Sequence, residues 1–142
     1  MEQDRGEAPF RPARILVVDD ERHIARFLVY VLTREGYEAQ AVYDGEEALA
    51  AVETFAPDAV LLDLLLPKLS GQEVLARLRA NPKYASLKIL MLTGCPVQDE
   101  AGPDTVNCRP DAYFLKPIGP SVLVDLLRQH GLHSQPEQEA AS

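Results

Sequence analysis

The amino-acid sequence predicts an α/β protein built on a doubly wound parallel sheet with helices on both faces. Along the chain, short apolar runs alternate with segments whose apolar residues recur every three or four positions. This alternation is typical of strands followed by amphipathic helices. The strongest runs are also hydrophobic at consecutive positions, as in parallel strands that helices cover on both faces.

Five apolar runs predict the five strands of this sheet. They cover residues 15–18, 37–42, 59–63, 89–93 and 112–116. The run at 37–42 gives the weakest signal. Turn-forming or helical segments separate consecutive runs, so each strand can return to the sheet parallel to its neighbours.

Helices are expected between the strands. The first carries apolar positions 24, 27, 28, 31 and 32 and ends near Gly36. The second turns positions 48, 49 and 52 inward and stops before Pro57, the third carries apolar positions 74, 75 and 78, and the last spans 120–129. A fourth, between Thr93 and Tyr113, is expected to be short or irregular, because a proline inside a helix costs about 3 kcal/mol and this interval holds several.

Length and charge narrow the classes of function. The 142 residues suit one domain, expected at 13–130 between a flexible arm at 1–12 and a flexible tail at 131–142.

A net charge of -8 disfavours binding to nucleic acid or anionic lipid. The longest nearly apolar run, 59–66, is too short to cross a bilayer, and the charged N-terminus is unlike a secretory signal. We therefore expect a cytoplasmic protein whose two cysteines are free thiols.

Polar residues stand where four of the apolar runs end. Asp19 and Asp20 follow the first run, Asp63 ends the third, Thr93 ends the fourth, and Lys116 ends the fifth. Ligands of open parallel sheets bind beyond the carboxyl ends of the strands. If these strands are neighbours, three carboxylates, a hydroxyl and an ammonium group meet in one small pocket.

Such a group of carboxylates predicts a bound cation. Two carboxylates about 4 Å apart repel by about 4 kcal/mol at an effective dielectric of 20, and one lysine cannot balance three acids. Oxygen ligands favour Mg²⁺ or Ca²⁺, and a site that stays open to water and phosphate favours Mg²⁺. The hypothesis is a site for Mg²⁺ and a phosphoryl group.

Four motifs, in order, carry a resemblance to a known family. They are Ile15-Leu16-Val17-Val18-Asp19-Asp20-Glu21, Asp63-Leu64-Leu65-Leu66-Pro67 with Gly71 after it, Leu92-Thr93-Gly94, and Lys116-Pro117. Asp20 and Asp63 are 43 residues apart, and Thr93 follows 30 residues later. Over residues 13–130 the chain resembles the CheY-like receiver domain of two-component response regulators. The resemblance implies the flavodoxin-like strand order 2-1-3-4-5.

The same resemblance assigns a chemical role to each acidic residue. Asp63 would accept a phosphoryl group from the phosphohistidine of a sensor histidine kinase or phosphotransfer protein. Asp19, Asp20 and Asp63 would hold Mg²⁺, together with the backbone carbonyl of Leu65. Such a protein is a signalling switch rather than an ordinary enzyme, since it catalyses only its own phosphorylation and dephosphorylation.

Three further residues would complete the switch by resemblance. Lys116 would pair with phosphoryl oxygens, Thr93 would donate a hydrogen bond to one of them, and Tyr113 would turn inward when Thr93 moves. A downstream protein effector would then read the changed surface, with the receiver acting as a monomer or weak dimer. The family usually has Gly-Ala where this chain has Arg109-Pro110, so we expect an unusual output surface around 95–110.

Other functions compete with the phosphorylated switch. A pseudo-receiver that acts as a scaffold without phosphorylation would not need Asp63, Thr93 and Lys116 together. A magnesium-dependent phosphohydrolase with an aspartyl nucleophile generally has a second acid two residues later, where this chain has Leu65. The switch could be a stand-alone protein, which the initial Met1 favours, or one piece of a larger regulator or hybrid kinase.

Overall fold

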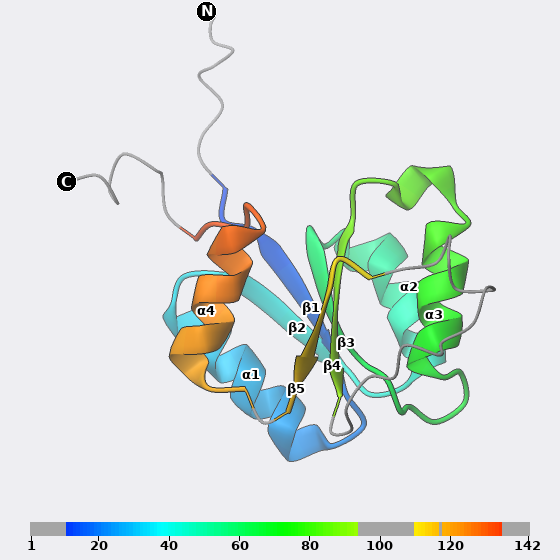
Figure 1. Ribbon diagram of the computed structural model, residues 1–142, viewed down its shortest axis with the longest axis horizontal. Helices are drawn as coiled ribbons and strands as arrows, with labels where there is room; N and C mark the ends of the chain where they lie inside the picture. Colours follow the sequence, from blue (N-terminus) through cyan, green and yellow to red (C-terminus); the bar gives the residue numbers. More distant parts are fainter. Residues whose placement is uncertain (1–10, 94–109, 117, 135–142) are drawn as a thin grey trace, which may run out of the picture.

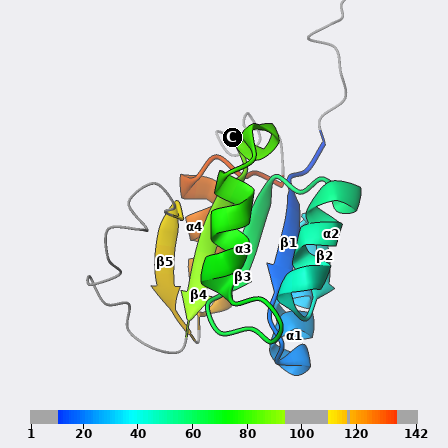
Figure 2. The same cartoon turned by 90° about the vertical axis from the view of Figure 1, so that its right-hand side faces the viewer.

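The computed structural model describes residues 11–93, 110–116 and 118–134, with the side chain of Thr93 left out (Figure 1). Five parallel strands form one sheet in the order β2-β1-β3-β4-β5, so the predicted fold class and strand order are confirmed. Figure 2 shows the strands side by side in this order. The strands are β1 (Arg14–Val18), β2 (Glu38–Val42), β3 (Ala59–Asp63), β4 (Lys88–Thr93) and β5 (Ala112–Leu115).

Helices cover both faces of the sheet, as the sequence predicts. Helices α1 (Arg22–Arg34) and α4 (Pro120–Gln129) lie on one face, and α2 (Gly45–Phe55) and α3 (Gly71–Arg79) lie on the other (Figure 1). A short 3₁₀ helix, η2 (Pro82–Tyr84), follows α3. The irregular helix expected between Thr93 and Tyr113 falls largely on residues 94–109, which lie outside the described residues, so α4 here is the helix expected at 120–129.

Two apolar layers hold the helices to the sheet, and β3 contributes to both. Leu61 faces the layer beneath α1 and α4, whereas Val60 and Leu62 face the layer beneath α2 and α3. All five residues of β3 are buried. Burying a side chain such as leucine contributes about 1.5–3 kcal/mol, so this continuous apolar run stabilises the centre of the sheet. The polar last residue, Asp63, is thereby fixed at the carboxyl end of this central strand.

Side-chain caps define the beginnings of the two helices on the α2/α3 face. Asp44 accepts a hydrogen bond from the backbone N–H of Glu47 at 2.8 Å, and Ser70 accepts one from that of Glu73 at 3.1 Å. Each cap satisfies a backbone donor that has no partner within its helix. Among the described residues, none of the helices is both long and apolar enough to cross a membrane.

The inward face of α1 differs from its expected periodicity at one position. Phe27 is 49% exposed, whereas Ala25, Leu28 and Leu32 are buried. Consecutive helical residues are about 100° apart, so a stripe centred on Leu28 leaves Phe27 at its edge. Phe27 instead lines a pocket at the carboxyl ends of the strands.

The packed part of the chain continues past residue 130. Leu132 is buried, and its carbonyl accepts a 2.7 Å hydrogen bond from the hydroxyl of Tyr37. The carbonyl of His133 accepts a 3.0 Å bond from the N–H of Ala13 at the start of the sheet. Within the flexible tail expected at 131–142, Leu132 and Ser134 are thus buried against the domain, and the residues after 134 lie outside the described part of the chain.

Candidate functional site

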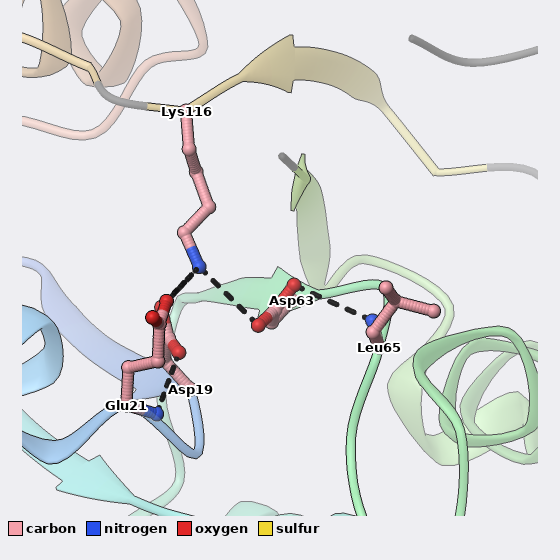
Figure 3. Close-up of polar contacts among 5 residues, drawn as sticks. All are labelled: Asp19, Glu21, Asp63, Leu65 and Lys116. Atoms are coloured by element: carbon pink, nitrogen blue, oxygen red, sulfur yellow. Dashed lines mark hydrogen bonds and ion pairs between the residues drawn. The ribbon is translucent and has the colours of Figure 1, made fainter. Parts of the chain in front are cut away.

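The acidic residues and the lysine meet at the carboxyl edge of the sheet. Asp19 follows β1, Asp63 ends β3, and Val18 pairs with Leu62 in the parallel register, so the two acids lie at the same level. Lys116 follows β5, and its side chain extends toward both carboxylates (Figure 3).

Lys116 contacts three carboxylates at once. Its Nζ lies 2.7 Å from Asp19 Oδ2, 3.3 Å from Asp63 Oδ2 and 3.4 Å from Glu21 Oε1. The side chains of Lys116 and Asp19 are 14% and 3% exposed, so this ion pair is largely shielded from water. Charge-assisted hydrogen bonds of this kind are stronger than those between neutral groups.

Three carboxylates lie close enough together to share a metal ion. One oxygen each from Asp19, Asp20 and Asp63 lies within 4.8 Å of the others, and Asp20 is exposed while the other two are buried. Hard cations such as Mg²⁺ prefer oxygen ligands and keep several waters, which an exposed Asp20 permits. The residues present therefore fit a magnesium ion.

Backbone donors orient the two buried acids. The N–H of Glu21 donates to Asp19 Oδ1 at 3.0 Å, and the N–H of Leu65 makes a longer contact with Asp63 Oδ1 at 3.4 Å (Figure 3). Each carboxylate thus has one oxygen held by backbone and the other directed at Lys116.

The charges of the site are only partly balanced. Burial raises the pKa of Asp63 to about 6, with the neighbouring Asp19 adding to the rise and Lys116 opposing it. Burial lowers the pKa of Lys116, but its hydrogen bonds and charge contacts with Asp19 and Asp63 raise it above its ordinary value. The lysine is therefore charged at neutral pH, and ionising Asp63 costs more free energy than ionising an ordinary aspartate.

The turn after β3 is tightly packed against the start of α3. A Cβ on Gly71 would lie 2.2 Å from the carbonyl oxygen of Asp63 and 2.8 Å from Cα of Leu64, distances that real Cβ atoms do not reach. The N–H of Gly71 also donates to the carbonyl of Leu64 at 2.9 Å. Glycine at this position therefore lets α3 fix the backbone that carries Asp63 and Leu65.

For three other expected site residues, Thr93, Tyr113 and Leu65, the structure shows the position but not the expected role. The backbone of Thr93 ends β4 opposite Leu115, and its side chain lies outside the described part of the molecule. Tyr113 is half-buried in β5 and packs against the apolar layer beneath α2 and α3. Leu65 has a side chain that is 65% exposed. The roles expected for Thr93, Tyr113 and the carbonyl of Leu65 stay predictions.

Sequence reasoning missed two features of the site. The first is the contact between Glu21 and Lys116. The only signal for it in the sequence is that Glu21 directly follows Asp19 and Asp20. A pocket of about 640 Å³ is lined by Asp63, by apolar residues of α1 and by Ile118. The helical period of α1 predicts a buried face, and it cannot show which apolar residues border a pocket.

Comparison with known proteins identifies the chain. The family model for the response regulator receiver domain matches residues 15–128. The chain belongs to the response regulator receiver family. Members of this family act in two-component signalling, and phosphorylation and magnesium binding through acidic residues are typical of them.

Curated relatives of this receiver domain are longer proteins. It is 40% identical over 121 residues to the DNA-binding response regulator MtrA of Mycobacterium tuberculosis, a match that covers 81% of this chain and 49% of MtrA. It is 43% identical over 109 residues to the alkaline phosphatase synthesis transcriptional regulatory protein PhoP of Bacillus subtilis, covering 75% of this chain and 43% of PhoP. The receiver chain spans about half the length of these relatives.

Solved structures have the same fold as this receiver domain. A putative response regulator from Chloroflexus aurantiacus matches with a TM-score of 0.74 and 34% identity, covering 84% of this chain and 98% of that one. A CheY-like receiver domain protein from Methanospirillum hungatei matches with a TM-score of 0.74 and 30% identity, covering 92% and 99%.

Proposed function

We propose that Asp63 accepts a phosphoryl group from the phosphohistidine of a sensor histidine kinase or phosphotransfer protein in a magnesium-dependent transfer. The aspartyl phosphate then switches a surface that a downstream protein effector reads. The observation that carries this proposal is the position of the Asp63 carboxylate. It lies in a pocket, beside the ammonium group of Lys116, and one of its oxygens lies within 4.8 Å of carboxylate oxygens of Asp19 and Asp20.

The transfer is a displacement at phosphorus. A carboxylate oxygen of Asp63 forms the new P–O bond while the P–N bond of the phosphohistidine breaks, and that bond's electron pair leaves with the imidazole nitrogen. Attack requires ionised Asp63, and with its pKa at about 6 the carboxyl is mostly ionised at neutral pH. Phosphoryl transfer depends chiefly on positioning and charge neutralisation, which this pocket supplies.

The proposed metal ligands are Asp19, Asp20, Asp63 and the backbone carbonyl of Leu65. A bound Mg²⁺ would neutralise charge between these oxygens and those of the phosphoryl group. The N–H of Glu21 holds Asp19 in a fixed orientation, and Gly71 fixes the turn that carries Leu65. These contacts would hold the backbone around the proposed ligands in place, while Lys116 would have to yield its contact with Asp19.

Three residues would respond to the phosphoryl group once it is on Asp63. Lys116, already 3.3 Å from Asp63, would pair with a phosphoryl oxygen. The hydroxyl of Thr93 would donate to another oxygen, and Tyr113 would turn into the space that Thr93 leaves. A phosphoryl group brings roughly -1.5 to -2 charge and new acceptor oxygens, enough to bias two packings of the β4–β5 side.

The partners in this proposal are proteins. MtrA is a DNA-binding response regulator, but the match with it covers only about half its length. A net charge of -8 opposes direct contact between this receiver domain and nucleic acid or an anionic membrane. We place the receiver in the cytoplasm, where response regulators usually act, as a monomer or weak dimer.

The test is phosphorylation by a small donor. The protein is incubated with acetyl phosphate and MgCl₂, and its intact mass is measured. A single phosphoryl adduct is expected, absent in Asp63→Asn and in EDTA, and present in Asp125→Asn, which alters an exposed acid on α4. Wild-type protein without an adduct would contradict the proposal and favour a scaffold. Repeated turnover of unrelated phosphate esters would favour a phosphohydrolase.

A further inference from the structure

The pocket beside Asp63 is lined by two kinds of residue, called below its polar side and its apolar side. Its polar side is formed by Asp20, Glu21, Asp63 and Lys116. Its apolar side comprises Ile24, Phe27 and Leu28 of α1, together with Leu65, Leu92 and Ile118. The carboxylate proposed to react therefore shares one pocket with these apolar side chains.

The apolar side is larger than the proposed chemistry requires. A phosphoryl group and a hydrated Mg²⁺ ion need polar partners, which the carboxylates and Lys116 already supply. A volume of about 640 Å³ lies in the range of pockets that hold whole organic ligands, roughly 300–1,000 Å³. Phe27 and Leu65 are 49% and 65% exposed, so apolar surface beside the reacting atom is open to an incoming group.

We propose that the apolar side of this pocket binds the leaving group of the phosphoryl donor when that group is aromatic or a branched hydrocarbon. Aryl acyl phosphates such as benzoyl phosphate are then better donors than acetyl phosphate. The inference rests on the proposed phosphorylation of Asp63. Its basis is that Asp63 and the apolar residues line the same pocket, so that a leaving group on a phosphorus atom at Asp63 has apolar surface within the same cavity.

The reaction with benzoyl phosphate is a single displacement. A carboxylate oxygen of Asp63 bonds to phosphorus, and the P–O bond to the benzoyl oxygen breaks. The electron pair of that bond stays on the benzoyl oxygen, and benzoate leaves. During the transfer, the ring lies against the apolar residues while the phosphoryl oxygens face Lys116. Repulsion between benzoate and the nearby acids then favours its departure.

Phe27 and Tyr30 offer a matched pair of variants. Both are exposed aromatic residues of α1, at 49% and 58%, but only Phe27 lines the pocket. Removing the Phe27 ring should weaken binding of an aromatic leaving group. Removing the Tyr30 ring changes an equally exposed surface outside the pocket.

The experiment measures the rate of adduct formation against donor concentration for acetyl and benzoyl phosphate, with MgCl₂ and intact mass as the readout. Benzoyl phosphate is expected to half-saturate at a concentration roughly tenfold lower than acetyl phosphate, the size of effect that one hydrophobic contact group gives. Phe27→Ala should bring the ratio of the two concentrations close to one, and Tyr30→Ala should leave it unchanged.

The outcomes separate this inference from the proposed function. If both donors phosphorylate Asp63 but the ratio is near one, or does not respond to Phe27→Ala, the inference is overturned while the proposed function stands. The apolar side would then be available to a partner's side chain. If neither donor gives an adduct, the proposed function and this inference both fail.

Discussion

Lys116 lies closer to Asp19 than to Asp63, with its Nζ 2.7 Å from Asp19 Oδ2 and 3.3 Å from Asp63 Oδ2. The lysine therefore contacts Asp19 more closely than it contacts Asp63, the proposed phosphoacceptor. A cation that binds Asp19 must compete with this ammonium group. On the proposed function, metal binding at Asp19 would release Lys116 toward a phosphoryl group on Asp63.

Replacing Lys116 with methionine should strengthen magnesium binding and weaken the metal-free fold. A unit charge about 4 Å away contributes about 1 kcal/mol even at the dielectric of water, so the magnesium affinity should rise roughly fivefold. Without the lysine, the buried carboxylates lose their partner, and the free energy of unfolding in EDTA should fall by up to about 3 kcal/mol. Calorimetric titration with MgCl₂ and urea unfolding measure the two effects.

Lys83→Met is the control for the first prediction. Lys83 is an exposed lysine on η2, away from the carboxyl edge of the sheet. It pairs with Glu53 of α2. Its replacement should leave the magnesium affinity unchanged. An unchanged or lower affinity in Lys116→Met would contradict the competition between lysine and metal.

Asp63→Asn should stabilise the metal-free protein at neutral pH and not at acid pH. Burial raises the pKa of Asp63 from its ordinary 3.8 to about 6. Stability from this group is therefore fully present below about pH 4 and is lost as the pH rises through about 6. Asparagine stays neutral, so the variant should gain up to roughly 3 kcal/mol at pH 7.5 and little at pH 4. Urea unfolding in EDTA at both pH values measures the difference.

A pH-independent gain would show that the effect comes from packing and not from charge. Asp125→Asn, at an exposed position of α4, should change stability little at either pH. A loss of stability in Asp63→Asn at pH 7.5 would mean that the ion pair with Lys116 outweighs the cost of burying the carboxylate.

Gly71→Ala should destabilise the protein and slow phosphorylation of Asp63. Alanine usually favours a helix over glycine, by about 1 kcal/mol. Here its Cβ would collide with the Asp63 carbonyl at 2.2 Å, and overpacking of this kind costs about 1–3 kcal/mol. The turn would shift and carry Asp63 away from Lys116. Urea unfolding and the rate of adduct formation with acetyl phosphate test both effects.

Gly119→Ala provides the matched comparison. Gly119 is the residue before α4, its backbone is extended, and a Cβ there would meet nothing within 4 Å. The free energy of unfolding of Gly119→Ala should stay within about 0.5 kcal/mol of that of the wild type. A Gly71→Ala variant as stable as Gly119→Ala would show that the turn has room to relax.

The sequence was sufficient for the centre of the sheet and for the acids at its edge. The apolar residues of β3 require burial on both faces of the sheet. Asp63 is the last residue of that run, so it lies at the carboxyl end of the strand. The grouping of Asp19 with Lys116 followed from the general rule that ligands bind at the carboxyl ends of parallel strands. These features depend on local residue patterns, which a single sequence contains.

Other features depend on contacts between distant segments and could not be read in the same way. Glu21 and Lys116 are 95 residues apart, and Tyr37 and the carbonyl of Leu132 are also 95 apart. The sequence shows neither the ion pair nor the hydrogen bond that holds residues 131–134. The contacts of Arg79 are a third feature that the sequence does not show. In the sequence, Arg79 lies near Arg77 and Lys83, a pattern typical of a solvated basic surface.

Arg79 joins three elements on the side of the sheet that carries β5. Its guanidinium donates to the carbonyl of Leu87 and to Asp111 Oδ2, both at 2.9 Å, and its side chain is only 17% exposed. The same Asp111 oxygen accepts a 2.7 Å bond from the N–H of Ile89. Arg79 thus ties the end of α3 to β4 and to the residue before β5, the strand that leads to Lys116.

Arg79→Ala should therefore loosen β5. Hydrogen bonds to charged groups contribute about 1.5–3 kcal/mol, so unfolding free energy should fall by about that amount, and amide hydrogens of β5 should exchange faster. Arg77→Ala is the control, because Arg77 is 56% exposed and its contact with Glu73 is 3.9 Å long, an ion pair that contributes at most about 1 kcal/mol. Equal effects in the two variants would contradict a specific role of Arg79. A larger loss in Arg79→Ala, with faster exchange confined to β5 and its junction with β4, would support it.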